Sequence, residues 1–324
     1  MIDASTPITP QALARPPRHA MRAAAPLAAL LYPAILWCGS RTSPVVLAIS
    51  LVVPVLGLVA SHRLAPGDGF PRARRIAHLV VAAPPLFALL GGWLDFQHAI
   101  AVHGLGVWLV LWSALTVVAV LERPRDERVC SPRSRRLAMA HGISAAAITL
   151  FAVAHLSNHL GGLAGGDTHM AIMHTLRKVY RHSLIEPILL AAVAFQIATG
   201  GVLLWRKVAR SSGWFDLLQT ASGAYLMMFL LSHTSAALRA RYLKGIDTNW
   251  AWASGSELLT DPWSVRLAPY YFLAVIAFGV HAACGLRTVA LGHGGSPVLG
   301  ARLVAIGAGL SALLSALIFI GLVR

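Results

Sequence analysis

Charged residues are scarce in this chain, and acidic residues are the scarcest. Only 12% of the 324 residues are charged, with 12 Asp and Glu against 27 Lys and Arg, whereas 57% are hydrophobic. Soluble globular domains carry about 25% charged residues. The composition therefore excludes a soluble protein, and lipid is expected to be the main solvent of the chain.

Cysteine is scarce as well. The three cysteines are Cys38, Cys130 and Cys284, and no two of them have the spacing of a zinc knuckle or a redox motif. An iron–sulfur cluster needs about four cysteine thiolates, so the chain cannot hold one alone. If the function is redox chemistry, we expect a partner subunit or protein to supply such a group.

The sequence also lacks the period-two alternation of a transmembrane β-barrel. Instead, it has nine apolar runs of the length of about 20 residues that a helix needs to cross a bilayer. The runs cover residues 21–38, 43–61, 76–93, 100–121, 137–160, 184–205, 214–238, 267–286 and 299–323. The predicted fold is an all-α polytopic membrane helix bundle with about nine transmembrane helices, four plus five.

The formal net charge is +15. Its basic residues lie in the short loops between apolar runs, which excludes nucleic acid as a partner and indicates a lipid bilayer instead. Most of the 27 basic residues fall on the side of the N-terminus, so the positive-inside rule predicts an N-terminus inside and a C-terminus outside. We expect a multi-pass protein of a bacterial-type inner (cytoplasmic) membrane.

The sharpest break in composition is a basic, proline-containing stretch after the fourth apolar run. It divides the chain into an N-terminal cytoplasmic tail (residues 1–20), a four-helix membrane region (21–121), a basic inner linker (122–136) and a five-helix membrane domain (137–324). Two outer loops are longer than a connection requires. Within residues 168–181, apolar side chains recur at helical spacing, which predicts a short surface helix. Residues 242–266 are predicted to form a lid at the membrane interface.

Histidine is abundant, with 14 residues. Placing an ionisable side chain inside a bilayer costs free energy, so the histidines within predicted spans are the candidates for a functional role. His155 and His233 each lie five residues before the outer end of a predicted helix. They therefore stand at one depth, about 7 Å inside the interface at 1.5 Å per residue. Two imidazoles at one depth on neighbouring helices can hold a haem edge-on between them. The other reading is that each histidine hydrogen-bonds a neighbouring helix.

His281 and His141 share a second depth, near the inner face, and form a candidate pair for a second cofactor. His141 is also close enough to the interface to be a hydrated residue. Histidines nearer the helix ends, such as His78, are interpreted as interfacial residues without a functional role.

Three segments of the last five helices resemble the five-helix cytochrome b subunit of succinate dehydrogenases and fumarate reductases, over roughly residues 136–324. They are AHLSNHL around His155, LQTASGAYLMMFLLSH ending at His233 and YFLAVIAFGVHAACGL around His281, with FQIATGG following the pattern of the family's second helix. The resemblance implies haem b, with His155 and His233 as the outer iron ligands and His281 as an inner ligand. It implies an electron-transfer subunit of a membrane oxidoreductase, acting between quinone and a redox partner.

The sequence departs from this family at Gln196, which stands where the second family helix carries the other inner ligand. Three alternatives follow for a second haem: His141 replaces the missing ligand, the inner site is empty, or a haem there is five-coordinate. The four N-terminal helices are also foreign to the family.

Other readings stay open. His155 and His159 share a helix face at i, i+4 spacing, with His169 and His174 beyond them on the outer surface, so the cluster is a candidate metal site of a membrane enzyme. A haem-free transporter or assembly factor would use the same histidines as relays. At the outer mouth, Arg177, Arg181 and His174 are candidate contacts for a quinone or for haem propionates.

Overall fold

The computed structural model describes residues 18–39, 45–64, 68–94, 102–125, 135–208, 210, 213–255, 257–261 and 263–324. The described chain is 88% helical and has no strand, which confirms the all-α prediction. Most of the predicted tail (residues 1–20) and of the predicted linker (122–136) lies outside the described residues.

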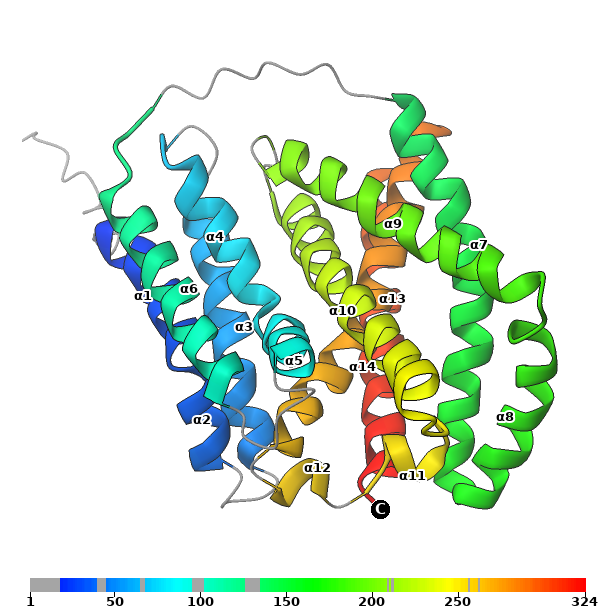
Figure 1. The fold of residues 1–324 in the computed structure, drawn as a ribbon. Coiled ribbons are helices and arrows are strands. Elements are labelled where there is room, and N and C mark those ends of the chain that lie inside the picture. The colour runs from blue at the N-terminus through cyan, green and yellow to red at the C-terminus, as the bar shows by residue number, and fades with distance from the viewer. Residues whose placement is uncertain are drawn as a thin grey trace, which may run out of the picture.

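The helices of the N-terminal half are α1 (Arg18–Leu30), α2 (Tyr32–Gly39), α3 (Val45–Arg63), α4 (Pro71–Val81), α5 (Ala83–Leu94) and α6 (Val102–Leu121). The C-terminal half contains α7 (Arg135–Gly161), η1 (Gly162–Ala164), α8 (Gly166–Tyr180), α9 (Ile185–Val208), α10 (Trp214–Lys244), α11 (Trp250–Ala253), α12 (Glu257–Thr260), η2 (Ser264–Arg266), α13 (Leu267–Gly292) and α14 (Pro297–Leu322). In Figure 1, α10 runs between the two halves, and the C-terminus lies at the same end as α11 and α12.

Each of the nine predicted apolar runs corresponds to a helix or a bent helix pair. Among the described residues, α6, α7, α9, α13 and α14 are long and apolar enough to cross a membrane, and two bent pairs raise the number of candidate spans to seven. The count of nine is therefore not reached by this criterion. The remaining runs are α3, whose apolar stretch is short, and α10, whose Ser, Thr, Tyr and His residues dilute its apolar character.

Proline explains the sharper of the two bends. The pair α4 and α5 is bent by 73° at Ala82, directly before Pro84 and Pro85. Neither proline has an N–H to continue the hydrogen bonds of the preceding helix, and the proline ring clashes with the carbonyl one turn earlier. The chain therefore changes direction inside this apolar run.

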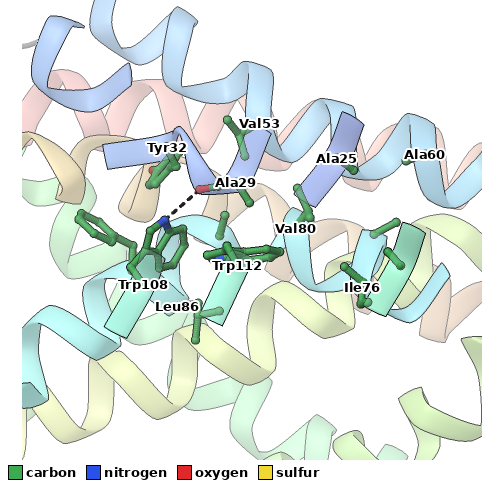
Figure 2. Packing of buried hydrophobic residues seen from close by; sticks show 14 of the residues in the cluster. Ala25, Ala29, Tyr32, Val53, Ala60, Ile76, Val80, Leu86, Trp108 and Trp112 are labelled. Carbon is green, nitrogen blue, oxygen red and sulfur yellow. Dashed lines mark hydrogen bonds between the residues drawn. The ribbon is translucent and has the colours of Figure 1, made fainter. Parts of the chain in front are cut away.

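The N-terminal half is packed around a continuous apolar core (Figure 2). Tyr32, Trp108 and Trp112 are completely buried in it, and the indole N–H of Trp108 donates to the carbonyl of Ala29 at 2.9 Å. Large side chains on the outer face of α6, such as Val110, are exposed, as expected of a surface that meets lipid.

The two halves are joined by buried polar contacts. His78 on α4 lies 3.0 Å from the hydroxyl of Thr220 on α10, and Arg74 donates to the C-terminal carbonyl of α9 at Val208, at 2.6 Å. His78 is only 2% exposed, so its interpretation as an interfacial residue is wrong. The sequence places it near a helix end, but α10 covers that end in the folded chain. These contacts fix the N-terminal half against α9 and α10.

Candidate functional site

The C-terminal half encloses a cavity of about 400 Å³, within the range of about 300–1,000 Å³ that is common for ligand and cofactor sites. Its walls are mainly apolar side chains of α7, α8, α9, α10, α13 and α14. On α13 the lining extends from Tyr271 to Ala282, a length of about 16 Å at 1.5 Å per residue. The helices of this half thus line a cavity, and the described helices of the N-terminal half pack on the apolar core of Figure 2.

His155 on α7 and His233 on α10 both line this cavity. Their ring centres are 6.1 Å apart and their ring planes are inclined by 64°. The structure therefore brings together the two histidines that were paired by depth. No hydrogen bond holds them in place within the described part of the chain, so their orientation has another cause.

A phenylalanine one turn earlier orients each of these imidazoles. Phe151 stacks on His155 with ring centres 5.6 Å apart, and Phe229 stacks on His233 with ring centres 5.1 Å apart. Both pairs have i, i+4 spacing, which places the two side chains on one helix face. Sequence reasoning missed this repeated F-x-x-x-H pattern, although it is visible in FAVAH and FLLSH.

The second histidine pair is held by hydrogen bonds instead. The rings of His141 and His281 are 6.5 Å apart. Nδ1 of His281 donates to the carbonyl of Gln219 at 3.1 Å. Nδ1 of His141 lies 2.9 Å from the hydroxyl of Thr199, which already donates its own proton to the carbonyl of Phe195. Nδ1 of His141 must therefore donate as well.

Both inner imidazoles are thereby fixed in the tautomer that leaves Nε2 unprotonated, as metal-ligating histidines require. Close packing supports the arrangement, since a Cβ at Gly200 or Gly223 would lie 3.4 or 3.1 Å from Cε1 of His141 or His281. The cavity reaches His281 but not His141.

The side chain of Gln196 is not oriented as a ligand of the inner pair. Its side-chain amide donates to the backbone carbonyl of His141 at 2.8 Å, which ties α9 to α7 beside the inner pair. Gln196 also lines the cavity. The imidazole that packs against His281 is therefore that of His141, and Gln196 bonds to the backbone instead.

Three arginines surround the outer end of the cavity, and two have a carboxylate partner. Arg177 pairs with Asp247 at 2.8 Å, and Arg241 holds Glu186 with both guanidinium branches at 2.5 and 3.1 Å.

Arg181 lines the cavity. Among the described residues, it donates to the hydroxyl of Thr248 alone, at 3.2 Å, and its buried Nε has no partner. Burial, followed by the neighbouring Arg177, lowers the pKa of the Arg181 guanidinium. Of the three predicted contacts at this mouth, Arg181 alone faces the cavity. Arg177 does not line it, and His174 is exposed.

His159 and His169 extend the histidine cluster outward from His155. Ring centres are 4.7 Å apart between His155 and His159, and 5.2 Å apart between His159 and His169. His169 is 2% exposed, so its predicted place on the outer surface is wrong, because α8 turns this face toward α7. Among the described residues, no group of three or more His, Cys, Asp or Glu converges as a metal-ligand set.

The segment between α10 and α13 contributes to the wall of the cavity. Trp250 of α11 packs on η1 and on the start of α8, where a side chain at Gly162 or Gly166 would collide with its indole ring. Its ring centre is 4.6 Å from that of His169, and Trp252 lines the cavity beside it. Trp250 and Trp252 thus lie against η1 and the start of α8 and beside the cavity, while the role of this segment as a lid stays a prediction.

Comparison of the chain with protein-family models, with curated proteins and with solved structures found no match. The resemblance to five-helix cytochrome b subunits therefore stays a prediction that rests on the quoted residues.

Proposed function

We propose that this chain is a membrane-bound b-type cytochrome that carries one haem b between His155 and His233 and transfers electrons between quinone and a redox partner. The observation that carries the proposal is the pair of imidazoles whose ring centres lie 6.1 Å apart in a mainly apolar cavity among the helices. Haem b, when bound, supplies one-electron redox chemistry, and the protein supplies ligands, orientation and exclusion of water.

The separation of the outer rings fits two axial ligands of one iron. A metal–nitrogen bond of about 2 Å on each side, plus roughly 1 Å from each nitrogen to its ring centre, puts two such imidazoles about 6 Å apart. The observed ring separation is 6.1 Å. Stacking of Phe151 and Phe229 restrains the two rings in that position, which reduces the entropy lost when they take up a ligand role.

Arg181 provides a positive charge for the haem propionates. A haem held edge-on would expose two carboxylates, and a partly buried guanidinium whose hydrogen bond among the described residues goes to a hydroxyl suits such an anion. Arg177 and Arg241 are already neutralised by Asp247 and Glu186. We therefore assign a propionate contact to Arg181 and to neither of the other two arginines.

The inner pair has the ligand chemistry for a second haem but lacks the space. His141 and His281 present unprotonated Nε2 atoms, yet the cavity does not reach His141. The proposal therefore assigns one haem b per chain. The reading as an enzyme with a histidine-bound metal has less support, because no ligand set converges in the described part of the chain.

Replacing either outer ligand tests the assignment. We expect His233→Ala and His155→Ala each to remove the same haem, because a bis-histidine site that loses one ligand binds haem weakly in an apolar cavity. The measurement is haem per purified protein by the pyridine haemochrome assay. His174→Ala, an exposed histidine of α8, is the matched control and should keep its haem. Full haem retention in His233→Ala would show that the pairing is wrong.

A further inference from the structure

Four helix ends meet where the two halves of the chain join, away from the cavity. Arg74 of α4 donates to the carbonyl of Val208 at the end of α9, at 2.6 Å. The ring of His62 at the end of α3 stacks on Trp214 at the start of α10, with ring centres 4.2 Å apart. These helix ends lie at the end of the molecule opposite α11 and α12, which is the end that the basic loops predict to be inside (Figure 1).

Aromatic rings hold cationic side chains at this junction. The guanidinium carbon of Arg75 lies over the ring of Trp205, 4.2 Å from its centre. Trp205 and Trp214 are 64% and 54% exposed, so both indoles face the surroundings of the protein. A guanidinium that lies over a ring directs its N–H groups along its own plane, where a phosphate can accept two of them. The stacking therefore prepares Arg75 for an anion at the edge of the indole.

The charge of this junction suits an anion as well. We define the inner seam as the stacked residues and the two arginines next to them in sequence, namely His62, Arg63, Arg75, Trp205, Arg206 and Trp214. The inner seam contains three arginines and no carboxylate. The carboxylate of Asp216, in the first turn of α10, pairs with Lys207 at 2.8 Å and is already neutralised. The inner seam is thus positively charged.

Exposed apolar side chains continue the inner seam toward the middle of the membrane. Val59 stands three residues before His62 on α3 and is 39% exposed, and Val202 stands three residues before Trp205 on α9 and is 43% exposed. Residues three apart share a helix face and differ in depth by about 4.5 Å. A soluble anion has no use for such apolar surface. A phospholipid has both a phosphate and acyl chains.

We propose that the inner seam binds an anionic phospholipid, with its phosphate at Arg75 and the neighbouring arginines and its acyl chains along Val59 and Val202. Basic sites between membrane helices on the inner side suit anionic headgroups. A lipid in this place contacts α3 and α4 of one half and α9 and α10 of the other, so it adds to the direct contact of Arg74 with Val208. The site contains no cavity histidine, and the inference does not depend on haem.

Binding of two lipids with the same acyl chains tests the proposal. Phosphatidylglycerol or phosphatidylcholine is added to the delipidated full-length protein in detergent, and bound lipid is measured by native mass spectrometry. We expect phosphatidylglycerol to bind at least fivefold more tightly, the effect of about one basic side chain at a headgroup. Equal affinities would overturn the proposal and leave the inner seam to an acidic soluble partner. Displacement of the lipid by inorganic phosphate would overturn it too, because the occupant would then be a soluble anion.

Variants locate the site. We expect Arg75→Gln to lower the preference for phosphatidylglycerol about fivefold, and Arg75→Lys, which keeps the charge, to retain most of it. Arg302→Gln is the matched control, because this exposed arginine of α14 lies at the same end of the molecule but outside the inner seam. An equal loss in Arg302→Gln would show that net charge alone attracts the lipid and would contradict the assignment. If Arg75→Gln does not fold, Arg63→Gln, which changes an exposed side chain, takes its place with the same expected result.

Thermal unfolding tests whether the lipid joins the two halves. A ligand that binds the folded protein raises its unfolding temperature. Phosphatidylglycerol should therefore raise the unfolding midpoint of the wild-type protein and of Arg302→Gln, and should raise that of Arg75→Gln much less. An equal increase in all three proteins would place the stabilising lipid elsewhere and contradict the proposal.

Discussion

At the scale of single residues, the histidines around the cavity differ in what fixes their rings. His141 and His281 are fixed by hydrogen bonds through Nδ1, which determines their tautomer. His155 and His233 are fixed by stacking on a phenylalanine one turn away, which leaves both ring nitrogens available. An imidazole that is only stacked in a cavity is therefore the better candidate for ligating the iron of a large planar group. An imidazole that is held by a hydrogen bond is the more rigid of the two.

Arg181 gives a residue-scale prediction that depends on charge alone. If a haem propionate contacts this guanidinium, the positive charge stabilises the reduced haem, which carries one positive charge fewer. We expect Arg181→Gln to lower the haem midpoint potential by tens of millivolts, where about 59 mV corresponds to a tenfold change for one electron. The measurement is a potentiometric titration. Arg181→Lys keeps the charge and should stay within a few millivolts of wild type, and an unchanged potential in Arg181→Gln would remove Arg181 from the site.

The proximity of His155 and His233 could be predicted from the sequence, because depth along a helix follows from counting residues. His155 and His233 were placed at one depth, and their rings are 6.1 Å apart. The burial of His169 could not be predicted in the same way. It depends on how α8 folds back toward α7 through η1, a tertiary arrangement that helical periodicity does not encode. For the same reason, Arg181 could not be separated in advance from Arg177 and His174.

At the scale of helices, the boundaries of the apolar runs predicted helix positions well, because a bilayer demands continuous backbone hydrogen bonding within each segment. The bend at Ala82 could have been predicted from Pro84 and Pro85. The bend between α1 and α2, 52° at Leu31, has a weaker signal in Pro33 alone. The cavity of the C-terminal half could not be predicted, because it depends on how the helices pack together and not on the apolar character of each one.

The packing of α13 against α14 gives an element-scale prediction. A Cβ at Gly307 would lie 2.5 Å from that of Ala283, and a Cβ at Gly279 would collide with Ser311, so the two helices approach closely through small residues. We expect Gly307→Val to lower the free energy of unfolding by about 1–3 kcal/mol, the usual cost of overpacking. The measurement is denaturant unfolding in detergent. Gly309→Val is the matched control on the same helix, because a Cβ there meets nothing within 4 Å. Equal destabilisation by both variants would show that close approach is not the cause.

At the scale of the whole molecule, the N-terminal half (α1 to α6) packs around an apolar core and is fixed by buried polar contacts to the half that contains the cavity. His78 with Thr220 and Arg74 with Val208 cross this junction. Both contacts involve α9 or α10, which also line the cavity. The N-terminal half therefore supports two walls of the candidate site from behind, although it contributes no histidine to it.

Orientation in the membrane is the whole-molecule prediction that follows from charge. The basic loops predict that the C-terminus lies outside. In the structure, α14 ends at the same end of the molecule as α11 (Figure 1). Trp252 of α11 lines the cavity. We expect a C-terminal alkaline phosphatase fusion to be active and a C-terminal green fluorescent protein fusion to be dark. The opposite pattern would invert the topology and place the Arg181 end of the cavity inside the cell.

The central claim is that haem b binds between the helices of the C-terminal half, and a reduced-minus-oxidised absorbance spectrum of the purified full-length protein tests it most directly. The protein is produced in cells that are supplied with a haem precursor, purified in detergent, and reduced with dithionite. The account predicts a b-type α-band with a haem content close to one per chain. A spectrum without that band, from protein that is folded and monodisperse, would contradict the account.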